Sequence, residues 1–237
     1  MRGHIYKNFS LCRGNVIFIA VMQALISATV IILTVFVRDN ISGEYSIGCA
    51  VSYALMPFLT AFSYTEYFKC DEQQTWVCFT ASTPQGFRGH VAGKYCTVLI
   101  INLAVLCCNL LTDLTAAAIL GTAEHIMPEV LILLFSAETV ICAFEMVFYI
   151  RFGSEAGSAV KGAVVGVIIS GLIVYLLFGD VSFLFSDDPL AELLEILSHP
   201  VPIWAALIIT LTSLGLYALS YAASLRLFRK GAESYGE

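Results

Sequence analysis

Six stretches of about 20 mostly apolar residues recur along the chain, and this repetition constrains the fold more than any other feature of the sequence. They cover residues 15–37, 46–65, 95–117, 127–150, 161–179 and 202–225. Of the 237 residues, 59% are hydrophobic and only 13% are charged, whereas soluble domains are about 45–50% apolar and about 25% charged. The sequence therefore predicts an all-α integral membrane protein with six transmembrane helices in a single domain, residues 1–237.

The basic residues predict which end of each span faces the cell interior. If both termini are cytoplasmic, all of the twelve lysines and arginines except Arg38 lie on the inner side, as the positive-inside rule requires. The loop before the last span carries acidic residues and no basic ones; the acids are Asp180, Asp187, Asp188, Glu192 and Glu195. We therefore expect a multi-pass protein with both termini in the cytoplasm and this acidic loop outside.

Two amphipathic segments flank the predicted bundle. In "IYKNFSLC", Ile5 and Phe9 recur at helical spacing beside basic residues, which is typical of a helix lying on the inner membrane surface. In "SDDPLAELLEILSHP", Pro189 suits a first helical turn, and leucines 190, 193, 194 and 197 form a helical stripe. We expect an N-terminal interfacial helix and an extracellular amphipathic helix, as membrane anchors or as parts of a transport device.

Motifs for chemistry are missing from the sequence. It contains no GxxxxGK[ST] phosphate loop, no HExxH and no GxSxG. The eight cysteines form no CxxC pair and have no histidine at zinc spacing, so we interpret them as small apolar residues. We expect that the chain is not an enzyme, that it holds no metal or cofactor of its own, and that nucleic acid is not among its partners.

A polar segment, "FKCDEQQTWVCFTASTPQGFRGHVAGKY", interrupts the apolar pattern at residues 68–95, in the largest predicted cytoplasmic loop. It resembles the first cytoplasmic loop of small permeases of the type-two ATP-binding-cassette (ABC) exporter family, on Phe68, Asp71, Glu72, Trp76, Phe79, Ser82, Pro84, Val91, Gly93, Lys94 and Tyr95. The stretch "YIRFGSEAG" at residues 149–157 resembles the segment by which the same family leaves its fourth span. Within this family the chain resembles permeases of bacterial exporters for phenol-soluble modulins, although "PQGFRGH" replaces the small residue and basic pair that usually follow the proline.

The resemblance implies a bacterial plasma-membrane permease that pairs with a second permease copy or paralogue and with cytoplasmic ABC ATPase subunits. ATP and magnesium would bind in the ATPase, and the cargo would be amphipathic or hydrophobic peptide. The ATPase-coupling residues would be Asp71, Glu72, Trp76, Phe79, Arg88 and Lys94. Trp76 and Phe79, three residues apart on a short helix, would present an aromatic edge to a groove of the ATPase. In the alternative interpretation the loop is solvated, and Trp76 and Phe79 only anchor it at the lipid headgroups of the inner membrane surface.

Four acidic residues fall in the third and fourth predicted spans: Asp113, Glu129, Glu138 and Glu145. An ionised carboxylate costs at least about 2.5–3.5 kcal/mol at the bilayer centre, so these side chains should face protein or water. Glu138 and Glu145 are seven residues apart and share one helical face. We expect no buried lysine or arginine beside them as an internal ion-pair partner. We interpret the acids as a polar translocation path for cationic cargo, or alternatively as hydrogen-bonding groups between helices.

Two other classes of function stay open at this point. An autonomous secondary transporter or channel would need inverted repeats or paired broken helices, and no internal repeat is evident in the sequence. A non-transporting membrane protein, such as an immunity or sensor factor, would leave the buried acids without a clear purpose. An adjacent gene for an ATPase would favour the exporter.

Overall fold

A computed structural model describes residues 2–11, 13–37, 49, 52, 53, 55, 86–121, 128–153, 155, 158–160, 162–164, 166, 167, 170, 171, 174 and 202–233. The main helices in this part of the chain are α1 (Arg2–Leu11), α2 (Arg13–Val37), α5 (Gly86–Leu120), α6 (Pro128–Phe152) and α9 (Ile203–Glu233). Apart from α1, each helix is long and apolar enough to cross a membrane. The mean hydropathy is 2.7 in α2, 2.0 in α5, 2.1 in α6 and 1.8 in α9. These four helices confirm the predicted spans at residues 15–37, 95–117, 127–150 and 202–225.

The other predictions about the fold lie wholly or mostly outside the described residues. Of the predicted spans at residues 46–65 and 161–179, only scattered residues are described, such as Tyr53 and residues 162–164, and they are helical. None of residues 189–198, the predicted extracellular helix, is among the described residues. Residues Arg2–Leu11 are helical, whereas their place at a membrane surface stays a prediction.

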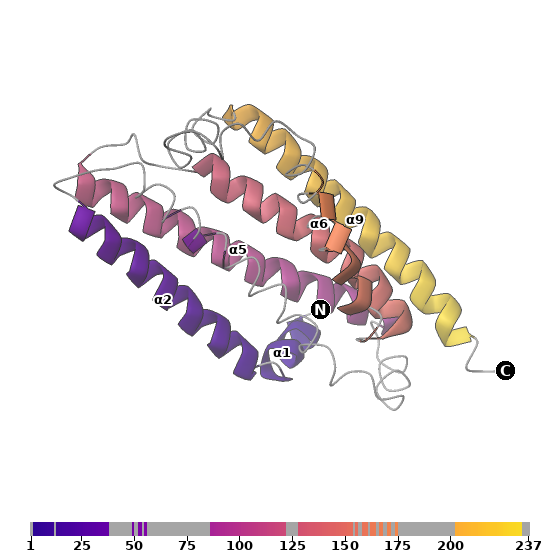
Figure 1. Ribbon diagram of the computed structural model, residues 1–237. Coiled ribbons are helices and arrows are strands. Elements are labelled where there is room, and N and C mark those ends of the chain that lie inside the picture. The colour runs from indigo at the N-terminus through magenta and orange to yellow at the C-terminus, as the bar shows by residue number, and fades with distance from the viewer. Residues whose placement is uncertain are drawn as a thin grey trace.

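The four long helices lie side by side in the order α2, α5, α6, α9 (Figure 1). Hydrogen bonds fix their directions. Gln23 and Ser27 of α2 meet Asn109 and Thr112 of α5, so these two helices run parallel. Ser136 of α6 is hydrogen-bonded to Thr210 of α9. Further along both helices, Ala143 of α6 is hydrogen-bonded to Ser220 of α9, so α6 and α9 are parallel as well. Contacts between Lys94 and Tyr149 and between Asn102 and Cys142 show that α5 and α6 are antiparallel.

These directions bring the basic helix ends together. The starts of α2 and α5 and the ends of α6 and α9 lie at one end of the bundle, which we call the cation-rich end (Figure 1). Exposed Arg13, Arg88, Arg151 and Arg226 lie there. It follows that the connection from α2 to α5, and that from α6 to α9, each join opposite ends of the bundle. The predicted spans at residues 46–65 and 161–179 would meet this requirement, and they stay predictions.

Helix α5 begins earlier than the sequence predicts. It starts at Gly86, which has a positive φ of 50°, and not near residue 95. The sequence prediction placed Arg88 and Lys94 in a loop because polar residues lower the local hydropathy, but a helix that continues beyond the bilayer can carry them. At 1.5 Å per residue its 35 residues span about 52 Å, while the hydrocarbon core is about 30 Å thick. Helix α5 is therefore long enough to project well beyond the hydrocarbon core.

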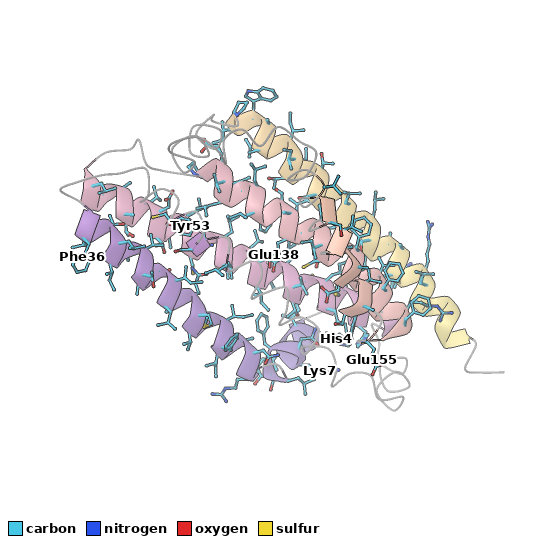
Figure 2. The ribbon with its side chains drawn as sticks, viewed as in Figure 1. His4, Lys7, Phe36, Tyr53, Glu138 and Glu155 are labelled. Atoms are coloured by element: carbon cyan, nitrogen blue, oxygen red, sulfur yellow. The ribbon has the colours of Figure 1, made fainter. Side chains whose placement is uncertain are left out.

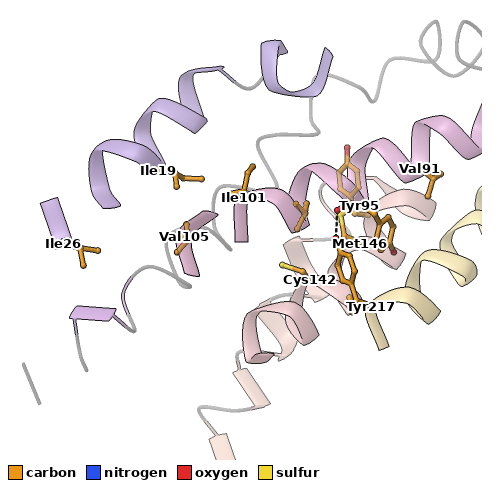
Figure 3. Packing of buried hydrophobic residues seen from close by; sticks show 12 residues of the cluster. Ile19, Ile26, Val91, Tyr95, Ile101, Val105, Cys142, Met146 and Tyr217 are labelled. Carbon is orange, nitrogen blue, oxygen red and sulfur yellow. Dashed lines mark hydrogen bonds between the residues drawn. The ribbon is translucent and has the colours of Figure 1, made fainter. Parts of the chain in front are cut away.

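Buried apolar side chains of α2, α5, α6 and α9 form one continuous core near the cation-rich end. Figure 3 shows this cluster, in which Tyr95 and Tyr217 lie beside Cys142 and Met146, with Val91 at one extremity and Ile26 at the other. A smaller cluster nearer the opposite end holds Val30, Tyr53 and Leu131. Because lipid is as apolar as these side chains, close packing and hydrogen bonding, and not exclusion from water, hold such helices together.

Small residues let α9 approach α6 closely. Ala206, Ser213 and Ser220 recur every seven residues, nearly two helical turns, and all three are buried. Small side chains on one face allow two backbones to come near each other, and serine adds hydrogen bonds across the contact. The contact between α6 and α9 is the most extensive between any two of the described helices.

Candidate functional site

Only part of the predicted ATPase-coupling segment is described. Asp71, Glu72, Trp76 and Phe79 lie outside the described residues, so their role stays a prediction. Arg88 and Lys94 both lie on α5, and not in a loop. Arg88 is exposed at the cation-rich end, whereas Lys94 is buried, with 5% of its surface exposed. Of these two described residues, Arg88 is therefore accessible to a partner, whereas Lys94 is enclosed by the chain itself.

Lys94 connects α5 to α6. Its Nζ donates to the Tyr149 hydroxyl at 3.4 Å and lies 4.7 Å from the centroid of the Tyr149 ring. Tyr149 is buried, and Glu145, one helical turn earlier on α6, is only 3% exposed. The expectation that no buried basic residue accompanies the acids is therefore wrong, because the extension of α5 carries Lys94 into the contact with α6. A buried ammonium group requires such polar and aromatic neighbours.

The next residue, Tyr95, connects α5 to α9. Its hydroxyl lies 2.7 Å from Oγ of both Ser220 and Ser224, which are one helical turn apart. A further bond joins the same two helices, because the hydroxyl of Tyr217 on α9 donates to the backbone carbonyl of Tyr95 at 2.9 Å, shown as a dashed line in Figure 3. Ser220 also donates to the Ala143 carbonyl of α6. Three helices thus share one hydrogen-bonded joint, which sequence reasoning missed because serines in a span resemble ordinary packing residues.

Helix α1 is fastened to the first turns of α5. Asn8 Nδ2 donates to Thr97 Oγ1 at 3.2 Å, and the rings of His4 and His90 meet edge to face at 6.4 Å between centroids. Gly93 makes this approach possible, since a Cβ atom there would lie 2.9 Å from the Cβ of His4. Figure 2 shows His4 and Lys7 on α1 near the cation-rich end. The glycine of the "GKY" triplet therefore has a packing role.

The four predicted path acids lie in different settings. Glu129 is partly buried in the first turn of α6, where a carboxylate complements the helix dipole. Asp113 is buried on α5, and its Oδ1 accepts a hydrogen bond of 3.5 Å from the Tyr53 hydroxyl. Glu138 and Glu145 are both 3% exposed on α6. Their arrangement as one continuous path stays a prediction.

Glu138 lines a small cavity between α5 and α6, and Figure 2 shows it near the centre of the bundle. Two carboxamides line the same cavity, those of Asn102 and Asn109, with apolar walls from residues that include Val105, Leu131 and Phe135. Sequence reasoning passed over both asparagines, although their spacing of seven residues places them on one face of α5. Gln23 of α2 donates to Asn109 Oδ1 at 2.7 Å. The polar centre of the bundle therefore extends over three helices.

A second, larger hollow lies between α6 and α9. It has a volume of ≈ 610 Å³ and is open to the outside of the chain. Its walls are almost wholly apolar and include Leu133, Val140, Phe144, Val164, Ile209 and Leu216. Among the described residues no group of three metal-ligating side chains comes together, and no disulfide involves the described cysteines, which are Cys49, Cys96, Cys107, Cys108 and Cys142.

Four long apolar helices that bury carboxyl, carboxamide and hydroxyl groups at their contacts define a multi-pass membrane protein. Residues 5–229, nearly the whole chain, match the family of ABC-2 family transporter proteins. The protein therefore belongs to the ABC-2 transporter family, whose members are membrane subunits that work with an ABC ATPase. No curated protein and no solved structure matches the chain.

Proposed function

We propose that the protein is the permease subunit of an ATP-driven exporter in a bacterial plasma membrane, and that it moves amphipathic or hydrophobic peptides out of the cell. Membership of the ABC-2 family supports the permease role. The observation that carries the coupling mechanism is the pair of contacts at the start of α5, where Lys94 meets α6 and Tyr95 meets α9. ATP and magnesium are bound by a separate ATPase subunit.

In this proposal, residues 68–95 couple the ATPase to the helix bundle. Trp76 and Phe79 bind in a groove of the ATPase, and Asp71 and Glu72 pair with its basic groups. Helix α5 continues from this segment without a break from Gly86 into the membrane. A displacement of the segment is therefore carried into α5 directly, and the contacts of Lys94 and Tyr95 pass it on to α6 and α9.

The cation-rich end faces the cytoplasm in this proposal. Exposed Arg13, Arg88, Arg151 and Arg226 at one end of the bundle agree with the positive-inside rule. The ATPase then binds at the end of the bundle where α5 begins. Both chain termini lie on the same side of the membrane.

The cargo is a peptide with an apolar face and basic residues. Apolar walls between α6 and α9 suit the apolar face, while Asp113, Glu129, Glu138 and Glu145 attract the basic residues. The cavity beside Glu138 is far too small for a peptide side chain, so cargo reaches this carboxyl only when α5 and α6 separate. A second permease copy or paralogue completes the path, as a dimer of permeases does in an ABC exporter.

The decisive experiment is co-purification of the chain with an ABC ATPase encoded beside it. Trp76 and Phe79 replaced together by alanine should abolish ATPase binding while the permease stays folded in detergent. Arg38→Ala, in the predicted external loop, is the matched control and should leave binding intact. Undiminished ATPase binding by the double variant would remove the coupling role of this segment, and a chain that transports without any ATPase would favour a secondary transporter or channel instead.

A further inference from the structure

The cavity beside Glu138 has the size and the lining of a site for a small polar ligand. The space open to the centre of a water-sized sphere is ≈ 10 Å³, which is close to the minimum of about 10–15 Å³ that one water molecule needs. Three of its lining residues are polar, namely Asn102, Asn109 and Glu138, and all are buried. An apolar cavity of this size stays dry, but a polar one with two to four hydrogen-bonding partners holds water.

The asparagine on the α2 side is held in a fixed orientation. Asn109 Oδ1 accepts the hydrogen bond from Gln23 Nε2 at 2.7 Å, and Gln23 Nε2 also donates to Ser27 Oγ at 3.3 Å. With its oxygen engaged in this way, Asn109 offers its NH₂ group to a ligand in the cavity. That group is a donor, and the carboxyl of Glu138 on the facing helix is rich in acceptors. A ligand between them must therefore both accept and donate hydrogen bonds.

We propose that one water molecule occupies this cavity and hydrogen-bonds to Glu138, Asn109 and Asn102, so that it joins α5 to α6 near the middle of α6. Water is the ligand that both fits ≈ 10 Å³ and combines two donors with two acceptor sites. Glu138 lies ten residues after Pro128, about 15 Å along α6, so the water is far from either end of the helix. The proposal does not depend on the transport function.

A water-mediated joint differs from a direct one in how it can open. When α5 and α6 move apart, the carboxyl and the two carboxamides keep a polar partner as further water enters. The groups that bond to the water thus stay solvated by it while the two helices separate. The site therefore gives the bundle a contact that can widen without first losing its hydrogen bonds.

Infrared spectroscopy of the chain in lipid vesicles tests this site. Exchange of H₂¹⁶O for H₂¹⁸O should shift a sharp O–H stretching band of an isolated water to lower frequency. Asn109→Leu and Glu138→Leu should each abolish the band, because each replaces a polar partner with an apolar group. Glu138→Gln should keep a displaced band, because its carboxamide still forms hydrogen bonds.

Thr97→Val is the matched control, since Thr97 is a buried polar residue of α5 that bonds to Asn8 of α1 and does not line the cavity. It should leave the band unchanged. A wild-type chain without an isotope-sensitive band, or a band that survives both leucine variants, overturns the proposal. If a leucine variant does not fold, density for a water in a high-resolution structure of the wild-type chain decides: a density peak in contact with the three side chains supports the site, and an empty cavity refutes it.

Discussion

The hydroxyl of Tyr95 on α5 lies 2.7 Å from Oγ of Ser224 on α9. Lys94, the residue before Tyr95, donates to Tyr149 on α6. Two consecutive residues of α5 are therefore bonded to two different helices, nine and ten residues into the 35-residue helix. Any rotation of α5 about its own axis moves both side chains together. Such a rotation therefore displaces the contacts with α6 and with α9 at the same time.

Tyr95→Phe should destabilise the chain modestly. The variant keeps the ring contacts with Tyr217 and Tyr221, whose centroids lie 5.0 and 5.5 Å away, but loses the hydroxyl that meets two serines. The loss of a hydrogen bond of this kind lowers the free energy of unfolding by about 0.5–1.5 kcal/mol. Thermal unfolding in detergent should show a lower midpoint, and Tyr221→Phe should show little change.

The pairing of Tyr95 with Ser224 can be separated from other effects by a double-mutant cycle. Ser224→Ala should also lower the midpoint, and the effect of the double variant should be smaller than the sum of the single ones. Strict additivity would mean that the two hydroxyls do not interact.

Gly93→Ala should displace α1 from α5. The new methyl group would lie 2.9 Å from the Cβ of His4, a distance that real Cβ atoms do not show, so one helix has to shift. In a cysteine-free background, cysteines at Asn8 and Thr97 should form a disulfide readily, and Gly93→Ala should reduce its yield several-fold. Gly215→Ala on α9 has open space around the new methyl group and should leave the yield unchanged, whereas an equal yield in the Gly93 variant would show that α1 accommodates the methyl group.

Lys94→Met should destabilise the chain more than Arg88→Met, because Lys94 is buried and Arg88 is exposed. We expect the ammonium group of Lys94 to offset the charge of Glu145, which lies one turn from Tyr149 on the same face of α6. A buried charge that is left uncompensated is costly wherever it lies. The double variant Lys94→Met with Glu145→Gln should therefore recover part of the thermal stability lost in Lys94→Met, and no recovery would show that the two charges are not coupled.

Glu138→Gln should leave expression and thermal stability equal to the wild type or slightly higher, because it removes a charge that is costly in the membrane. It should lower export of a cationic peptide by the reconstituted complex, or the stimulation of its ATPase by that peptide. Glu138→Leu should lower transport further, since it removes the polar surface as well as the charge. Normal transport by both variants would show that Glu138 is a structural hydrogen-bonding residue and not part of the path. Lower stability of both variants, without a selective transport defect, would show that Glu138 holds neighbouring helices together.

Hydropathy alone predicted four of the described helices, since 20 apolar residues in a row have few other folds available to them. It failed at the start of α5, where Arg88 and His90 lower the local hydropathy and make the first turns of the helix resemble a loop. The same error concealed the burial of Lys94, which is the only buried lysine among the described residues. Hydropathy measures the cost of lipid contact, and a side chain enclosed by neighbouring helices does not face lipid.

The polar contacts of the site were less predictable than the helices. Glu138 and Glu145 could be assigned to one helical face from their spacing, and both are buried on α6. That Tyr95 meets Ser220 and Ser224, or that Gln23 orients Asn109, depends on how each helix is rotated against its neighbours. Rotation follows from packing over whole helix faces, and a single sequence carries no direct record of it.

The length of α5 has a mechanical consequence. If the helix is a stiff rod that tilts about the joint at Tyr95, its two lever arms are unequal. The arm from Gly86 to Tyr95 is about 13.5 Å long, and the arm from Tyr95 to Leu120 is about 37.5 Å. A displacement of 1 Å at the short arm then becomes about 2.8 Å in the opposite direction at Leu120. A small push on one side of the membrane would thus be amplified into a wider opening on the other, without any change in the length or the hydrogen bonds of the helix itself.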